Sequence, residues 1–244
     1  MARLWRIVFV ALLGLTQPVL AGPPYLSDDP EPTDYKHYEI YTFSNGTATR
    51  DGRNGAMGID FNYGAAPNLQ LTATLPAGFE SPNGGRTSIG PSNIELAAKY
   101  RFLRQDTFGW DVSVFPRVFL PSPSSVVGDS NLSLLLPIWA QKDFGGGWST
   151  FGGGGCSLNA DSSHNSCMAG WVVTRKILPK LQLGVELSHR TADSSGTPAS
   201  SSLGVGVTYD INDTYHLLGY VSRGIQSTNQ TDQYSWYAAL LTTF

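Results

Sequence analysis

Charged side chains are scarce in this sequence of 244 residues: Asp, Glu, Lys and Arg together make up 14%. Soluble domains average about 25%. The hydrophobic fraction, 41%, is ordinary. This combination suits a chain whose strands each turn one face to lipid, where a charge is costly. A long helical period is also missing, which argues against a helical fold.

Signals for nucleic acids, metals and cofactors are missing as well. No basic tract follows the N-terminal leader, which excludes nucleic acid as a partner. The 4 histidines show no metal-ligand spacing. The glycine run "FGGGGC" lacks the Lys-Ser/Thr pair of a phosphate-binding loop. We therefore expect no metal, no cofactor and no catalytic site.

One enzymatic alternative rests on His164 and Ser166, which have the His-x-Ser spacing of outer-membrane phospholipases. A hydroxyl nucleophile needs a nearby base and a third group that orients the base. The sequence identifies no such third residue, and the residues around the pair do not match those enzymes. We expect a solvated polar loop here, and a protein that is not an enzyme.

The N-terminal apolar run, from Ile7 to about Leu15, is too short to span a membrane as a helix. Two arginines precede it, and a small-residue cleavage site follows. This pattern predicts a secretory signal peptide over residues 1–21, cut after Ala21.

Cysteine occurs only twice, as Cys156 and Cys167. In an exported protein such a pair usually forms a disulfide. The bridge would close the polar loop "CSLNADSSHNSC". The alternative is two free thiols.

What the sequence does contain is a repeated period of two. In "LQLGVELSHR" the leucines and valine alternate with Gln, Gly, Glu, Ser and Arg, as in a strand with one apolar and one polar face. Residues 22–36, which come before the first strand-like stretch, are rich in Pro and Asp, and we expect an irregular periplasmic segment there. The pattern predicts about twelve strands, near residues 37–48, 55–64, 68–77, 93–103, 109–120, 132–143, 148–157, 166–178, 181–190, 201–210, 214–225 and 234–244.

A soluble β-sandwich would also alternate, but two features favour a membrane barrel. Long and short connections mostly alternate along the chain, as in outer-membrane barrels. Aromatic residues gather at the short-turn end, where a membrane interface would favour them. We therefore predict an all-β fold, a transmembrane antiparallel β-barrel over residues 37–244. The predicted aromatic girdle comprises Tyr63, Phe102, Trp110, Phe144, Trp148, Tyr209, Tyr215 and Phe244.

The chain ends on an aromatic residue in the middle of a strand-like pattern, "YSWYAALLTTF". We expect this last strand to pair with the first and close the barrel, so that no edge is left in the outer-membrane bilayer. Phe244 would then lie in the girdle. It also resembles the C-terminal aromatic signal that bacterial outer-membrane barrels present to the barrel-assembly machinery.

Charged residues on the polar strand faces should point into the lumen, because a Lys or Arg facing lipid near the midplane costs about 2–4 kcal/mol. They can form a constriction that selects solutes, or an ion network that fills the barrel. Whether the N-terminal segment also enters the lumen is left open. The predicted lumenal residues are Asp60, Glu95, Lys99, Arg101, Asp111, Arg117, Arg175, Glu186 and Arg190.

The short connection "RQDT" limits the register of its hairpin. A three-residue turn would place Phe102 opposite Trp110 on the lipid side. In the lumen, Arg101 would face Asp111, and Glu95 would face Arg117. A second tight turn, "PK", would place Arg175 opposite Gly184 and diagonal to Glu186, inside the barrel together with Trp171.

Several stretches resemble one family of bacterial outer-membrane barrels, labelled "transporter" or "MetA-pathway of phenol degradation". They are "YLSDDPEPTDYKHYEIY", "DFNYGAAPNLQLTATLP", "NIELAAKYRFL", "VFPRVFLP", "GWVVTRKILPKLQLGVEL" and "YSWYAALLTTF". The resemblance implies an outer-membrane barrel with a proposed role in moving small compounds, aromatic ones among them. The expected function is thus a channel or transporter for small solutes. The alternative is a non-transporting barrel that serves adhesion, reception or structure.

Overall fold

The structure is a computed structural model that describes residues 24–124, 127–162 and 164–244. The expected signal peptide, residues 1–21, and its cleavage site lie outside the described residues. No helix of the described residues is long and apolar enough to cross a membrane.

The described residues form fourteen strands and one short helix. The elements are β1 (Tyr38–Ala48), β2 (Gly52–Ala66), β3 (Leu69–Pro82), β4 (Ser88–Pro91), β5 (Glu95–Leu103), α1 (Gln105–Phe108), β6 (Asp111–Val114), β7 (Arg117–Phe119), β8 (Ser133–Gly145), β9 (Trp148–Asn159), β10 (Ser166–Leu178), β11 (Leu181–Arg190), β12 (Ser200–Asp210), β13 (Tyr215–Gly224) and β14 (Tyr234–Thr243).

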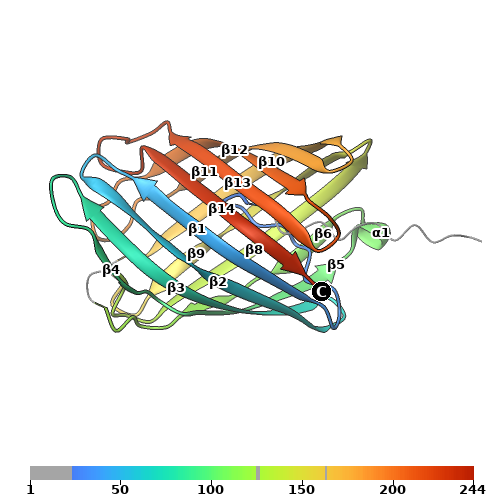
Figure 1. Ribbon diagram of the computed structural model, residues 1–244, viewed down its shortest axis with the longest axis horizontal. Coiled ribbons are helices and arrows are strands. Elements are labelled where there is room, and N and C mark those ends of the chain that lie inside the picture. Colours follow the sequence, from blue (N-terminus) through green and yellow to red (C-terminus); the bar gives the residue numbers. More distant parts are fainter. Residues whose placement is uncertain (1–23, 125–126, 163) are drawn as a thin grey trace, which may run out of the picture.

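The strands form one antiparallel sheet that closes on itself (Figure 1). β4 and β5 both pair with β3, and together they act as one interrupted strand. β6 and β7 both lie between β5 and β8, where Phe115 and Pro116 break the ladder. The fourteen segments therefore occupy twelve positions in the wall, and the predicted twelve-stranded barrel is confirmed.

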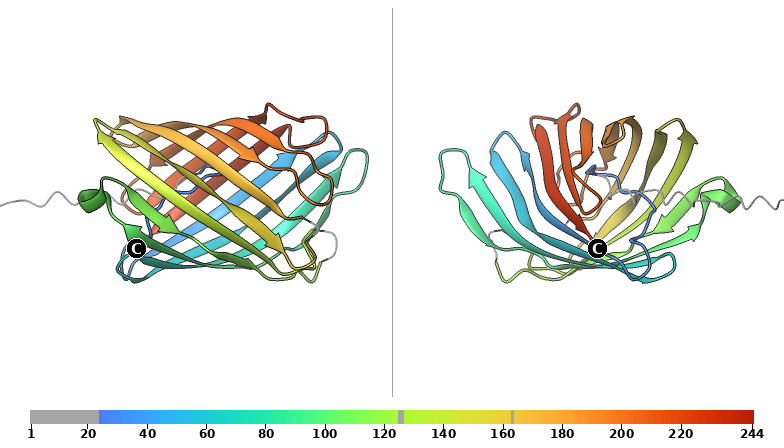
Figure 2. Two further views of the ribbon diagram at one scale, coloured as in Figure 1. Left: turned by 180° about the vertical axis from the view of Figure 1, so that it is seen from behind. Right: turned by 45° about the vertical axis from the view of Figure 1, so that its right-hand side comes forward.

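Closure of the barrel joins the two ends of the chain. β1 pairs with β14 from Glu39 opposite Thr243 to Ala48 opposite Tyr234. Phe244 extends this ladder, because its backbone N–H donates to the carbonyl of Tyr38 and its carbonyl accepts from the N–H of Tyr38. Each of the twelve positions in the wall thus has two neighbours. Figure 2 shows the wall from two further sides. A sheet that spans a membrane has to close in this way, because lipid offers no hydrogen-bond partners for the backbone groups of an open edge.

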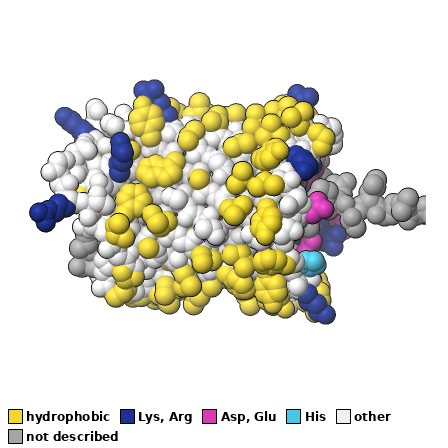
Figure 3. All heavy atoms as spheres, viewed as in Figure 1, with side chains coloured by type: hydrophobic (Ala, Val, Ile, Leu, Met, Phe, Trp, Pro, Cys, Tyr) yellow, Lys and Arg dark blue, Asp and Glu magenta, His cyan; other side chains and the backbone are white. Residues whose placement is uncertain are grey.

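The two faces of the wall differ as the period of two predicts. On β11, Leu183, Val185 and Leu187 are exposed on the outside, while Gly184, Glu186 and Ser188 are buried inside. The same alternation on the other strands gives the outer surface its apolar band (Figure 3). The outside of the barrel is therefore suited to lipid, and the polar side chains gather in the lumen.

The predicted register of the β5–β6 hairpin is wrong by two residues. Arg101 lies opposite Ser113 rather than Asp111, and Glu95 lies opposite Phe119 rather than Arg117. The connection is longer than a three-residue turn because it forms the helix α1, which Gly109 ends with a φ of 80°. A shift of two residues keeps every side chain on its face. Arg101 and Asp111 therefore still meet in the lumen, but as a diagonal pair.

The predicted register of the β10–β11 hairpin is wrong by one residue, which has a larger consequence. Arg175 lies opposite Leu183, because a bulge between Lys176 and Leu178 adds a residue to β10. A shift of one residue moves a side chain to the other face. Arg175 and Trp171 therefore point outward, and the prediction that they lie in the lumen is wrong.

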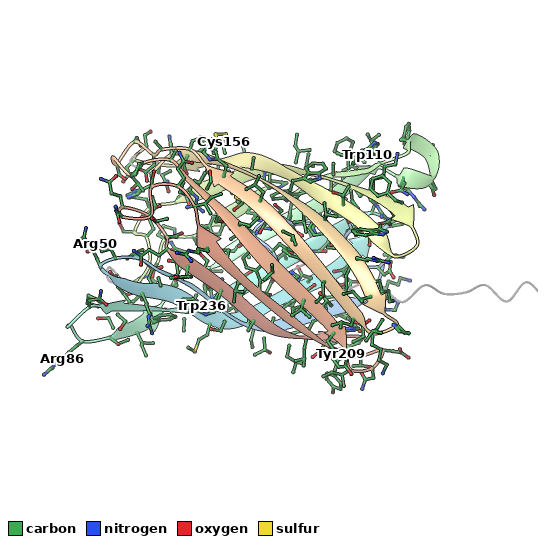
Figure 4. The ribbon with its side chains drawn as sticks, turned by 90° about the horizontal axis from the view of Figure 1, so that it is seen from above. Arg50, Arg86, Trp110, Cys156, Tyr209 and Trp236 are labelled. Carbon is green, nitrogen blue, oxygen red and sulfur yellow. A yellow bond between two sulfur atoms is a disulfide. The ribbon has the colours of Figure 1, made fainter. Side chains whose placement is uncertain are left out.

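The two cysteines are joined by a disulfide between Cys156 and Cys167. They lie directly opposite each other on β9 and β10. β9 continues to Asn159 and β10 begins at Ser166, so half of the expected loop belongs to the two strands of the hairpin. The bridge lies on the outer face, toward the long-loop end (Figure 4).

Candidate functional site: the barrel lumen

The chain before β1 lies inside the barrel (Figure 2, right). We call residues 24–34 the lumenal segment. It leaves the lumen at the short-turn end, where the N–H of Lys36 donates to the carbonyl of Gly64 at 2.8 Å. The sequence left open whether this segment enters the barrel. The structure places its described part in the lumen, rather than in the periplasm outside the barrel.

One end of the lumenal segment is held by β11 and its neighbours. The buried carboxylate of Glu186 accepts hydrogen bonds from the backbone N–H groups of Leu26, at 3.1 Å, and Ser27, at 2.7 Å. Tyr25 packs edge-on against Phe151 and Tyr220, with ring centroids 5.7 and 5.6 Å apart. Glu186 therefore receives its hydrogen bonds from the segment, as a buried charge requires.

The middle of the segment meets the basic residues of the opposite wall. The carboxylate of Asp28 lies 3.0 Å from Lys99 Nζ and 2.9 Å from Arg117 Nη2. Asp29 lies 3.5 Å from the same Lys99 Nζ. Lys99 is only 4% exposed, so these short pairs replace water around its charge.

The lumenal charges also pair within the wall. Arg117 Nη1 lies 3.6 Å from Glu95 Oε1, and Arg101 Nη1 lies 3.4 Å from Asp111 Oδ1. The guanidinium of Arg117 stacks on the ring of Phe115 at 4.2 Å. The segment and the wall thus form one ion network across the lumen.

Further contacts fix the segment on its way to β1. Gln141 Nε2 donates to Glu31 Oε1 at 3.3 Å, and Lys99 Nζ donates to the backbone carbonyl of Glu31 at 3.3 Å. The N–H of Thr33 donates to Gln70 Oε1 at 2.8 Å. The lumenal segment is therefore bound by side chains from four strands, β3, β5, β8 and β11.

Cavities lie on either side of the lumenal segment, and two of them share its residues. The larger one has a volume of about 810 Å³ and reaches Asp232 and Ser200 near the long-loop end. The smaller one, of about 50 Å³, lies beside Gln182 and Thr208. Pro24, Tyr25, Asp29 and Glu31 line both cavities. The segment is therefore the constriction of the lumen.

The wall of the larger cavity has an aromatic side and a charged side. Tyr41, Phe43, Tyr220 and Tyr237 line it from β1, β13 and β14, and Phe43 and Tyr237 stack in parallel with centroids 6.4 Å apart. The ionisable residues among its lining comprise nine carboxylic acids and four Lys or Arg. The cavity can therefore hold a solute with an aromatic part, and its formal charge is negative.

The structure places eight of the nine predicted lumenal residues on the inner face. Asp60, Glu95, Lys99, Arg101, Arg117 and Arg190 line the larger cavity. Asp111 and Glu186 are buried in the wall below it. Arg175 is the exception, and outside the barrel its guanidinium stacks on Trp148 at 4.9 Å.

The residues of the predicted girdle lie where the short turns and the C-terminus meet. Figure 4 shows Trp110 and Tyr209 near this end. Phe102, Phe144, Trp148, Tyr209, Tyr215 and Phe244 are exposed, whereas Tyr63 and Trp110 are half-buried. Trp110 does not pair with Phe102. It lies edge-on to Trp171, and the ammonium of Lys142 lies over its ring at 5.4 Å.

The sequence analysis missed the part that the lumenal segment plays. Its acids Asp28, Asp29 and Glu31 complete the ion network, and Tyr25 completes the aromatic packing. A signal was present, because "YLSDDPEP" places an aromatic residue and three acids just before the first strand. The segment has no periodicity, however, so the pattern could not place it.

The two residues of the alternative enzyme pair lie at the β9–β10 hairpin. His164 lies in the turn of the β9–β10 hairpin and is exposed, and Ser166 begins β10. Among residues 24–124, 127–162 and 164–244, no three His, Cys, Asp or Glu side chains form a metal-binding group.

The mouth of the barrel is shaped by loops with internal hydrogen bonds. Between β11 and β12, the carboxylate of Asp193 accepts from the N–H groups of Ser195 and Thr197 and from the Ser195 hydroxyl. These bonds, above all that from the hydroxyl, hold the pKa of Asp193 below its ordinary value. The loop is therefore ordered around the carboxylate of Asp193 at the mouth.

Comparison with known proteins agrees with this architecture. A family model described as "Putative MetA-pathway of phenol degradation" matches residues 38–238. A search of curated protein sequences finds no match.

Solved structures with a similar fold are outer-membrane channels and porins. The COG4313 outer membrane channel from Pseudomonas putida F1 matches with a TM-score of 0.67 and 13% identity, over 88% of this chain and 99% of that one. The KdgM porin matches with a TM-score of 0.58 and 12% identity, over 84% and 99%. The NanC porin matches with a TM-score of 0.58 and 8% identity, over 84% and 98%. At these identities the likeness shows a shared barrel fold.

Proposed function

Since the chain belongs to the family described as "Putative MetA-pathway of phenol degradation" and folds as an outer-membrane barrel, we propose that it is a channel for small solutes. The observation that carries this proposal is the cavity of about 810 Å³ inside the closed wall. A barrel that served only as a wall would have no need of such a space. The lumenal segment lies across the passage between the two cavities, so the proposed channel is a restrictive one.

The lining favours cations over anions. Nine carboxylic acids and four basic side chains surround the larger cavity, and rings of acidic side chains select cations in pores. The constriction is acidic too, because Asp29 and Glu31 lie there. We therefore expect a cation-preferring current.

Planar bilayers test this proposal with refolded protein under a KCl gradient. We expect small conductance steps and a reversal potential on the cation side. A variant that lacks residues 24–34 should conduct several-fold more, and so should a variant in which a Gly-Ser linker of equal length replaces them. If all three proteins are silent while a known porin conducts, the barrel does not transport, and an adhesive, receptor or structural role takes the place of the channel.

The aromatic side of the cavity supports a finer proposal about the solute. Tyr41, Phe43, Tyr220 and Tyr237 form one wall, and an aromatic face attracts cations and aromatic rings. We expect benzyltrimethylammonium to block the current for longer than its saturated cyclohexyl counterpart. The double substitution F43A/Y237A should remove this difference. Equal block by both ions in the unmodified channel would argue against an aromatic preference.

A further inference from the structure

We propose that the outer surface near the long-loop end binds the phosphate groups of lipid A, the phosphorylated glycolipid of the outer leaflet. The site consists of Arg53 on β2 and Arg223 on β13. Arg50 in the β1–β2 turn and Arg86 in the β3–β4 loop extend it toward the long-loop end (Figure 4). It lies outside the barrel and is independent of the proposed channel.

The two central arginines lie in one row across the sheet. Arg223 is opposite Tyr234, and Tyr234 is opposite Ala48. Ala48 in turn is opposite Arg53. Both arginines therefore belong to the outer face, with three strand spacings, about 14 Å, between them. A disaccharide with a phosphate at each end spans a comparable distance.

The floor between the arginines is flat enough to accept a sugar. Ala48 carries only a methyl group, and Tyr234 lies under the guanidinium of Arg223, whose carbon is 5.7 Å from the ring centroid. No hydrogen bond from the Arg223 guanidinium to another described residue accompanies this contact. Arginine binds phosphate through paired N–H groups.

An aromatic row directly below sets the depth of the site in the membrane. Trp236 lies across Gly46, and Phe79 lies across Gly55, with the two rings stacked 6.3 Å apart. A Cβ on Gly46 would collide with the Trp236 ring. This row is two residues deeper along each strand, about 6.6 Å. Aromatic rings mark the edge of the apolar layer, so the arginines lie just beyond it, at the level of lipid phosphates.

Among the described residues, the two central arginines have no carboxylate partner. In the described part of the chain, neither Arg53 nor Arg223 forms an ion pair, whereas Lys99, Arg101 and Arg117 in the lumen all do. Figure 3 shows Lys and Arg at both ends of this face, whereas the acidic side chains visible on it lie at the short-turn end only. Exposed arginines at a membrane surface without carboxylate partners favour anionic head groups.

The test measures the binding of lipid A to the full mature barrel in a zwitterionic detergent, by native mass spectrometry. The variant R53Q/R223Q removes the two central charges. The matched control R175Q/K180Q removes two exposed charges from the short-turn end, one of which, Arg175, also stacks on an aromatic ring. Heat-modifiable gel mobility selects folded barrels for every comparison.

We expect R53Q/R223Q to bind bisphosphorylated lipid A at least about tenfold more weakly, because two charge-assisted hydrogen-bonding partners are lost. The control should bind like the unmodified barrel. Lipid A stripped of phosphate should bind the unmodified barrel as weakly as it binds R53Q/R223Q. Equal affinity of the unmodified barrel for the two forms of lipid A would overturn the proposal without recourse to any variant. So would unchanged binding by R53Q/R223Q.

Discussion

At the scale of single residues, four cations of the wall have partners that differ with the face on which they lie. Lys99 and Arg117 lie in the lumen and are matched by carboxylates of the segment and the wall. Lys142 and Arg175 lie outside and stack on tryptophans at the short-turn end. A cation next to lipid can use an aromatic face, whereas a cation in the lumen can be matched by a carboxylate. Substitution of a lumenal cation should therefore change the ion selectivity or the stability of the barrel more than substitution of an outer cation.

The substitution R117Q should shift the current further toward cations. It removes a positive charge from the lumen, takes away the cation beside Glu95 and leaves Asp28 with Lys99 alone, so the pore becomes more negative. The reversal potential in a KCl gradient measures the change. R175Q is the control, because Arg175 lies outside the pore. A shift of equal size in R175Q would show that the lumenal charge does not set the selectivity.

The substitution K99M should destabilise the barrel by about 3 kcal/mol, because it leaves Asp28 and Asp29 buried with one cation fewer. Urea unfolding in lipid vesicles, followed by tryptophan fluorescence, measures this loss. K142M provides the comparison, since Lys142 contacts only the outer face of Trp110 among its described charge interactions. If K99M and K142M unfold at the same urea concentration, the ion network contributes little to stability.

At the scale of elements, the sequence predicts the strands and their faces far better than the connections. The period of two on β11 or β12 predicts which side chains point inward and which point outward, because one side of the strand meets lipid and the other meets the lumen. No such pattern in the sequence predicts the helix α1 or the bulge after Lys176. The helix shifts the β5–β6 register by two residues. The bulge shifts the β10–β11 register by one residue, and this second shift moves Arg175 to the outer face. The lumenal segment was least predictable, since its position depends on contacts from four strands distant in sequence.

The disulfide offers a test at the same scale. Cys156 and Cys167 bridge β9 and β10, and closing about a dozen residues should contribute roughly 3 kcal/mol on the chain-entropy model. The double substitution C156S/C167S should therefore lower the urea midpoint, and reductant should lower that of the unmodified protein to the same value. Thiol labelling of unfolded, unreduced protein should find no free cysteine. Two labels per chain would contradict the bridge.

At the scale of the whole molecule, the closed wall makes stability a property of the complete barrel. A closed barrel resists mild detergent and keeps a compact shape. Unboiled protein should therefore migrate faster than boiled protein on a mildly denaturing gel, with a β-type circular dichroism spectrum before boiling. Identical mobility of the two samples, together with a helical spectrum, would exclude the barrel.

The pairing of β1 with β14 also makes closure of the barrel depend on residues that are far apart in the sequence. Tyr38 begins β1 and Phe244 follows β14, and their backbones hydrogen-bond to each other. Contacts between such distant residues are slow to form, because the chain loses loop-closure entropy before the contact stabilises it. Until β1 and β14 pair, each presents an open edge for which lipid offers no hydrogen-bond partners. The lumen is therefore separated from the lipid only once this pairing is complete.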